Sequence, residues 1–307
     1  NTSEFNINNS GAASSQNPLE VINAHKAFGY GLTGSGETIA IMDNGHWTSH
    51  QELAGNSKSI TTYGTLVAAT NSNYHGLTVA SFAAGEDDGT GMQGVAPSAS
   101  LHLSDYANKN GETDFATHWA SATDAAATAN AIVQNNSWGG SNATIATINT
   151  YMTDNSVTNS VALAAYFTAN SLTSSESSIN AYVESLNNFQ DKGVVVFALS
   201  NTSSLADADA HAALPEFYSQ LSEAWITAVN VEITGTSGNE TYTRKSAPCG
   251  SSGAYCLGGD GWQLNGAKFN SGSIDNYWTG ASGTSFVAPM ISGSVALLAE
   301  AFPNHTP

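Results

Sequence analysis

The apolar residues of this chain fall into short blocks whose spacing distinguishes strands from helices. Blocks rich in β-branched residues predict strands at "ETIAIMD" (37–43), "SLHLSDY" (100–106), "AIVQNNSWG" (131–139), "GVVVFALSN" (193–201) and "AWITAVNVE" (224–232). Helical spacing predicts helices in "HGLTVASFAAG" (75–85), in "TDFATHWASATDAAATANA" (113–131) and from Ser285 onward. The last helix has no polar face before Glu300, so we expect it to be buried.

Strands that alternate with helices are typical of an α/β fold, here a doubly wound parallel sheet flanked by helices in three layers. The run 193–201 is apolar on both faces, which favours a central position in the sheet. Ligands of such folds bind beyond the carboxyl ends of the strands. Asp43, Asn201 and the polar tip at 135–139 all fall at predicted carboxyl ends. The sequence therefore predicts a site at that edge of the sheet.

The length of 307 residues suits one large domain. Residues 1–18 are polar and predict an irregular N-terminal arm, and residues 19–307 predict a single catalytic domain. The polar segment at about 140–192 predicts an insertion that elaborates one crossover. No apolar run approaches the roughly 20 residues that span a bilayer, and the first residues lack a signal pattern. We expect a soluble monomer without a membrane span, in a mature or trimmed form.

The net charge of the chain limits the kinds of partner that it is expected to bind. Lys and Arg number 7 and Asp and Glu number 25, a net charge of −18. Nucleic acids and anionic membranes require basic patches, so neither is an expected partner.

The two cysteines, Cys249 and Cys256, close the short stretch "CGSSGAYC". Glycines at 250 and 253 let the ends of this loop meet, and we expect a disulfide and an oxidising compartment. Two free thiols or half of a metal site are the alternatives.

A serine beside a buried helix directs attention to nucleophilic chemistry. A serine nucleophile needs a base, a group that orients the base, and donors for the developing oxyanion. Ser285 lies among small residues in "TGASGTSFVAPM", where helix N–H groups and the helix dipole favour negative charge. His75 can act as the base, Asp43 can orient the imidazole, and Asn201 can donate its side-chain amide to the oxyanion. The chain order Asp, His, Ser is that of subtilisin.

These motifs resemble those of the subtilisin-like serine proteases, the subtilases of peptidase family S8. The similarity extends from about residue 20 and rests on "IAIMDNG", "HGLTVA", "QGVAPSASL", "NNSWGG", "VVVFALSN" and "GTSFVAP", which occur in the family's order. The resemblance implies a subtilisin-like fold and a serine endopeptidase that acts on protein or peptide substrates. It also implies that Ser137, Trp138 and Gly139 pair with the substrate backbone, and that Ser200 borders the S1 pocket.

Within the family, "INAHKAFGYGLTGSGETIAI", "AALPEFY" and "CGSSGAYCL" are most similar to autotransporter-type bacterial subtilases. This subgroup implies an exported bacterial protein, secreted or at the cell surface. Subtilases commonly carry structural calcium, so the resemblance allows bound structural Ca²⁺. We expect no cofactor to be required for catalysis, and we predict no metal-ligating residues. His46 and His50 lie near Glu52, but the segment lacks the H-E-x-x-H form of a zinc site.

Several neighbours of the catalytic positions depart from the family pattern. Asn44, Leu77, Ser200 and Phe286 stand where the family usually has Thr or Ser, Thr, Gly and Met. An alternative function is therefore a surface binding or adhesion module on a subtilase scaffold, with idle or self-processing activity only. A sedolisin-type carboxyl-serine peptidase would need an acidic residue in place of Asn201.

Overall fold

The computed structural model describes residues 5, 17–55, 58–139, 143–236 and 238–306. Most of the predicted arm at 1–18 lies outside the described residues. Pro18 already belongs to a helix, α2 (Pro18–Val21), whose N-cap residue Asn17 accepts a hydrogen bond from the Leu19 N–H. The short helix α3 (Ala24–Gly29) follows.

The central sheet is almost entirely parallel, as the sequence predicts. In spatial order it contains β2 (Ile60–Thr62), β3 (Ser100–Asp105), β1 (Thr38–Asp43), β4 (Val133–Asn136), β5 (Val194–Ala198), β6 (Trp225–Thr236) and β7 (Asn239–Arg244), with β8 (Cys256–Gly259) also paired to β6. β5 lies between two parallel neighbours, which fits its apolar character on both faces. The exception to the parallel order is β7, which runs antiparallel to the end of β6.

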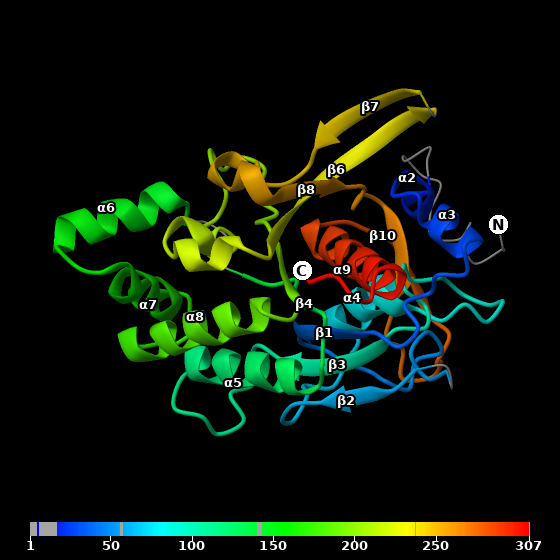
Figure 1. Cartoon of the computed structure of the whole chain (residues 1–307), viewed down its shortest axis with the longest axis horizontal. Helices are drawn as coiled ribbons and strands as arrows, with labels where there is room; N and C mark the ends of the chain where they lie inside the picture. The colour runs from blue at the N-terminus through cyan, green and yellow to red at the C-terminus, as the bar shows by residue number, and fades with distance from the viewer. Residues whose placement is uncertain (1–4, 6–16, 56–57, 140–142, 237, 307) are drawn as a thin grey trace.

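Helices cover both faces of this sheet (Figure 1). On one face lie α4 (His75–Ala84) and α9 (Thr284–Ala301). On the other lie α5 (Phe115–Thr128) and α8 (Glu176–Gln190). Alternate residues of β1 serve the two layers, since Ile39 and Ile41 pack with α4 and α9 while Met42 packs with α5 and α8. The three-layer α/β fold is therefore confirmed.

The segment predicted as an insertion contains α6 (Ile145–Asn155), α7 (Asn159–Ala169) and α8, all between β4 and β5 (Figure 1). α8 packs on α5 and β5, and its buried side chains join the core of that layer. The domain boundaries drawn from the sequence stay a prediction.

Several short elements have no clear signal in the sequence. These are β2, the antiparallel pair β9 (Leu264–Ala267) and β10 (Tyr277–Ala281), and the 3₁₀ turns Leu214–Glu216, Ser219–Ser222 and Gly250–Tyr255. β7 has no buried residue in its sequence NETYTR, so it lacks the apolar alternation that reveals a strand. It forms a hairpin with an extended β6 that projects from the body of the molecule (Figure 1).

The predicted disulfide is confirmed. Cys249 and Cys256 are bonded and enclose the last of these 3₁₀ turns. Among the described residues, α9 is long and apolar enough to cross a membrane, but 61% of it is buried inside the fold. Its packing against β4, β5 and α4 identifies it as a core helix, as the sequence predicts.

Candidate active site

Asp43 and His75 are brought together by the turn that follows β1. Asp43 ends the strand, and Gly45 continues the chain at a φ of +74°, a conformation that favours glycine. The N–H of Gly76 donates to the Asn44 carbonyl over 2.6 Å, and the N–H of Leu77 donates to the Gly45 carbonyl over 3.1 Å. The turn thereby caps the N-terminus of α4, whose first residue is His75.

The imidazole of His75 is bonded to the carboxylate of Asp43. Nδ1 of His75 lies 2.8 Å from Oδ1 of Asp43, which also accepts the Asn44 N–H over 2.7 Å. Asp43 is fully buried, whereas about 35% of the His75 side chain is exposed. An Nδ1–H donated to Asp43 leaves Nε2 as the basic nitrogen. Burial lowers the pKa of His75, but the charge and hydrogen bond of Asp43 outweigh it, and the pKa lies above its ordinary 6.5.

Ser285 lies in the first turn of α9 and is bonded to the end of β4. Its hydroxyl donates to the Ser137 carbonyl over 3.2 Å, and the Ser137 hydroxyl donates to the Ser285 carbonyl over 3.0 Å. Pro289 explains the second bond, because a proline four residues on has no N–H to offer that carbonyl. The reciprocal pair fixes the start of α9 to the strand tip. The Ser285 hydroxyl bonds Ser137 rather than His75, and catalytic contacts often tighten only when substrate binds.

Asn201 follows β5 and meets the start of the same helix. Its Oδ1 accepts the N–H of Thr284 over 3.0 Å and the Thr284 hydroxyl over 3.1 Å. With the oxygen engaged, the Nδ2 group is the end of the amide that can donate to a substrate oxygen. The N–H of Ser285 is among the first N–H groups of α9, which have no partner within a helix.

One cavity of about 350 Å³ joins these groups. His75, Ser285 and Asn201 all line it. Its two walls are formed by 137–139, after β4, and by 198–200, at the end of β5. Every predicted site residue lines this cavity except Asp43, which is hydrogen-bonded to His75, and the two cysteines.

Comparison with known families decides what kind of protein carries this site. The model of the subtilase family, Peptidase_S8, matches residues 34–307. The chain belongs to the subtilase family. The match covers all the residues that line the cavity.

Relatives of this subtilase include an extracellular serine protease of Serratia marcescens, 26% identical over 334 residues, which cover 93% of this chain and 30% of the relative. A second extracellular serine protease of the same organism is 33% identical over 138 residues, covering 39% of this chain and 11% of the relative. The chain therefore spans less than a third of the length of the curated relatives it matches.

Solved structures agree on the fold. Fervidolysin from Fervidobacterium pennivorans, described as a keratinolytic enzyme related to subtilisin, aligns with a TM-score of 0.64 at 20% identity, over 100% of this chain and 42% of its own. Sphericase aligns with a TM-score of 0.60 at 21% identity, over 89% of this chain and 80% of its own. The narrower similarity of this subtilase to autotransporter-type proteins stays a prediction.

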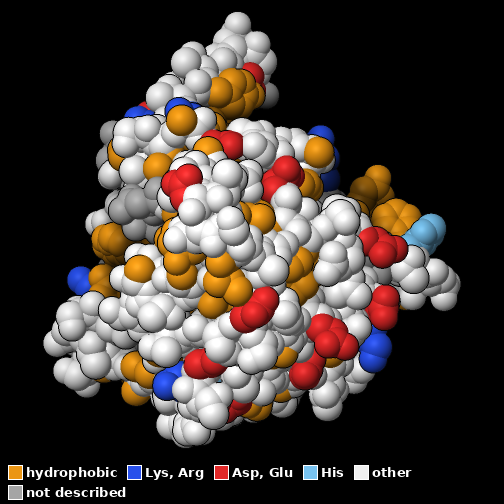
Figure 2. Space-filling model, turned by 90° about the vertical axis from the view of Figure 1, so that its left-hand side faces the viewer, with side chains coloured by type: hydrophobic (Ala, Val, Ile, Leu, Met, Phe, Trp, Pro, Cys, Tyr) orange, Lys and Arg blue, Asp and Glu red, His pale blue; other side chains and the backbone are white. Residues whose placement is uncertain are grey.

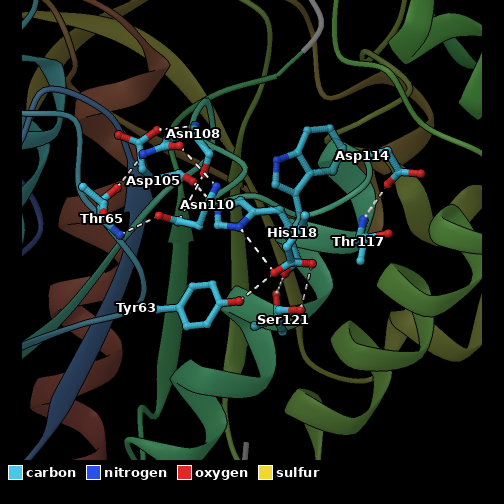
Figure 3. Close-up of polar contacts among 12 residues, drawn as sticks. Tyr63, Thr65, Asp105, Asn108, Asn110, Asp114, Thr117, His118 and Ser121 are labelled. Carbon is cyan, nitrogen blue, oxygen red and sulfur yellow. Dashed lines mark hydrogen bonds and ion pairs between the residues drawn. The ribbon is translucent and has the colours of Figure 1, made fainter.

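The rim of the subtilase cavity is stiffened by an aromatic and polar network next to β3. Tyr106 stacks on Trp138, with ring centroids 4.7 Å apart and an interplanar angle of 3°. The Tyr106 carbonyl accepts the indole N–H of Trp119 over 2.9 Å, and the Asp105 carbonyl bonds Nε2 of His118 over 2.6 Å. Figure 3 shows His118 beside Tyr63 and Ser121, with Asp105, Asn108 and Asn110 grouped at the loop after β3. These contacts position Tyr106 and, through the stacked rings, Trp138 at the rim of the cavity.

The cavity is also lined by residues that the sequence analysis did not single out, among them Tyr106, Leu172, Thr202 and Asp209. Asp209 lines the cavity, and its side chain is buried. Its Oδ2 accepts the Ser200 N–H over 2.7 Å, and its Oδ1 accepts the Ala212 N–H over 3.1 Å. Burial raises the pKa of Asp209 to about 6, against the opposing effect of the backbone N–H groups. Asp209 lies in "ADADAHAALP", where the alternation of alanine with polar residues does not distinguish Asp209 from Asp207.

The two other histidines near Asp43 in the sequence, His46 and His50, form hydrogen bonds with backbone carbonyls. His46 bonds the carbonyls of Asp43 and Ser104 through Nε2, and His50 bonds the Asn276 carbonyl. Within the described part of the chain, no group of three or more His, Cys, Asp or Glu side chains is arranged to hold a metal ion. Structural calcium stays a prediction, as do catalysis without a cofactor and the monomeric state.

Proposed function

We propose that this subtilase is an exported serine endopeptidase that hydrolyses peptide bonds through Asp43, His75 and Ser285. The observation that carries the proposal is the 2.8 Å hydrogen bond from His75 Nδ1 to the buried Asp43, because His75 lines the same cavity as Ser285. Nδ1 engaged in this way leaves Nε2 as the base. The family's serine peptidases and the relatives named as extracellular serine proteases support the same reading.

The first half of the reaction forms an acyl-enzyme. The Ser285 oxygen attacks the scissile carbonyl carbon while Nε2 of His75 takes the hydroxyl proton. The Asn201 Nδ2 group and the Ser285 N–H donate to the carbonyl oxygen as it becomes negative. Asp43 keeps the imidazole in one tautomer and stabilises the imidazolium. His75 then gives its proton to the leaving amine, and the C–N bond breaks.

The second half returns the enzyme to its starting state. Water enters, His75 takes one of its protons, and the resulting hydroxide attacks the acyl carbon. The ester bond to Ser285 breaks and His75 returns the proton to the serine oxygen. Throughout the reaction, the substrate backbone pairs as an added strand with residues 137–139.

Export rests on two features. The relatives are named as extracellular, and the Cys249–Cys256 bond suits an oxidising compartment.

A Ser285→Ala protein tests the proposal against casein. In subtilisin, loss of the serine or of the histidine costs about a million-fold in kcat, and loss of the oxyanion asparagine costs about a hundred- to a thousand-fold. We expect losses of this order for Ser285→Ala and Asn201→Ala. Ser294→Ala is the matched control, because that hydroxyl bonds the Met290 carbonyl of its own helix.

A Ser285→Ala protein that cleaves casein at the parent rate would contradict the proposal. A folded parent that cleaves nothing would favour the binding-module alternative instead.

A further inference from the structure

The floor of the cavity carries a negative charge between its two walls. Oδ2 of Asp209 is bonded to the backbone N–H of Ser200, on one wall. Oδ1 is near Gly139 on the other, since a Cβ built on Gly139 would lie 3.9 Å from it. The carboxylate therefore spans the gap between the two strand ends that border the cavity.

Two strand-like contacts hold Asp209 in this position. Asp209 pairs with Thr144 in an antiparallel bridge, and the N–H of Ala210 donates to the Ala143 carbonyl over 2.8 Å. The N–H of Ala213 donates to the Asp209 carbonyl over 3.1 Å. These contacts fix the backbone on both sides of Asp209 and thereby position its side chain.

No cation of the chain compensates this charge in the described residues. None of the ion pairs found in this part of the chain involves Asp209, and no cation is among the groups that shift its pKa. His211, two residues from Asp209, is fully buried among aromatic rings, and burial lowers its pKa to about 3. His211 is therefore neutral at neutral pH and contributes no positive charge to the floor.

A buried carboxylate without its own cation can gain strongly from a cation brought by a ligand. Taking a charge out of water costs free energy that an ion pair with good hydrogen bonds offsets. The backbone N–H groups of Ser200, Asp209, His211 and Ala212 already stabilise the Asp209 carboxylate, but none of them carries a formal charge, so a ligand cation would add a charge-assisted interaction that the backbone does not supply. At pH 7 and above Asp209 is mostly ionised, because its pKa is raised only to about 6.

Resting on the proposed peptidase function, we infer that Asp209 is the specificity-determining residue of the S1 pocket and selects substrates with lysine or arginine at P1. The ammonium or guanidinium group of that side chain reaches the floor between Gly139 and Ser200 and pairs with the carboxylate. A neutral aliphatic P1 side chain would instead lie over an uncompensated charge.

The test compares internally quenched peptides that are identical except for Lys, Arg, Gln or Leu at P1. We expect kcat/KM for P1 Lys or Arg to exceed that for P1 Leu by at least tenfold in the parent protein. In Asp209→Asn, the ratio of kcat/KM for P1 Lys to that for P1 Leu should fall at least tenfold. A parent that prefers P1 Leu, or an unchanged ratio in the variant, would overturn the inference and leave Asp209 as a structural residue.

A measurement on the parent alone covers the case in which Asp209→Asn does not fold. Benzamidine is a cationic probe of about the size of a P1 side chain, and benzamide is its neutral counterpart. We expect benzamidine to inhibit P1 Leu cleavage competitively at least tenfold more tightly than benzamide. Equal inhibition by the two compounds would overturn the inference.

Failure of the proposed function has a different signature. If the parent cleaves no peptide in the series and does not react with a fluorophosphonate at Ser285, the peptidase proposal fails. If it reacts and cleaves but shows no preference for Lys or Arg, only the assignment of Asp209 fails.

Discussion

At the scale of single residues, the pKa of His75 sets a testable limit on activity. The imidazole must be neutral to accept the serine proton, and its pKa lies above 6.5 because the Asp43 charge outweighs burial. Activity should therefore rise with pH through a midpoint above 6.5. The measurement is the pH profile of kcat/KM with a peptide that has an uncharged P1 residue. A midpoint at or below 6.5 would contradict the assignment of Asp43 as the partner of His75.

The hydroxyl of Ser137 is predicted to affect both the stability of the protein and kcat. It satisfies the Ser285 carbonyl that Pro289 leaves without a helix bond. Ser137→Ala leaves the buried Ser285 carbonyl without this hydrogen bond, which should lower the free energy of unfolding by about 1–3 kcal/mol. The displaced start of α9 should also lower kcat. Urea unfolding and steady-state kinetics measure the two effects.

Ser292→Ala is the matched control for this prediction. Its buried hydroxyl bonds Asn135 and the Ala288 carbonyl, away from the Ser285 backbone. We expect Ser292→Ala to lower stability with a smaller effect on kcat. Equal effects of the two substitutions on kcat would show that the Ser137 bond has no special role in positioning the serine.

At the scale of elements, the strands with buried apolar runs could be predicted from the sequence, whereas the segment 140–192 was predicted only as an insertion, although α8 buries Ile179, Tyr182 and Leu186 at helical spacing. β1, β4 and β5 carry buried runs that end in Asp43, Asn136 and Ala198, so the carboxyl edge could be located. His75 and Ser285 could be placed because each lies in the first turn of a helix with small residues around it. β7 has no buried residue and gave no such signal.

The position of Asp209 in the cavity could not be predicted from the sequence, for a different reason. Its place on the cavity floor depends on the bridge to Thr144, a residue 65 positions earlier. A long-range pairing of this kind cannot be recognised from the residues next to Asp209. The direct contact between Ser137 and Ser285, 148 positions apart, is hidden in the same way, although both residues were predicted to belong to the site.

The disulfide is an element whose removal has a predictable effect on stability. Cys249 and Cys256 are separated by 7 positions, so the cross-link closes a short loop, for which chain entropy gives about 2.5 kcal/mol of stabilisation. The double variant Cys249→Ser, Cys256→Ser should unfold at lower urea concentration than the parent. Reductant should shift the parent toward the variant and leave the variant unchanged. A parent insensitive to reductant would contradict the predicted contribution.

At the scale of the whole molecule, the net charge of −18 should act on substrates before they bind. Acidic side chains are spread over the face of the molecule shown in Figure 2, and such a field attracts cations from a distance. Salt shortens the reach of this field, from about 30 Å at 0.01 M to about 10 Å at 0.1 M. We expect kcat/KM for a cationic peptide to fall over this range more steeply than for a neutral peptide.

The salt response separates the field of the molecule from the pairing at Asp209. Asp209→Asn removes one of 25 acidic side chains, so the slope with salt should persist in that variant while the P1 preference is lost. Identical salt slopes for cationic and neutral peptides would argue against steering by the net charge.

The central claim is that His75 activates Ser285, and labelling with a fluorophosphonate tests it most directly. The parent, Ser285→Ala and His75→Ala proteins are treated with the probe, and the adduct is located by peptide mapping. We predict an adduct on Ser285 in the parent and none in either variant. A folded parent that forms no adduct, or a His75→Ala protein labelled at Ser285 as fast as the parent, would contradict the account.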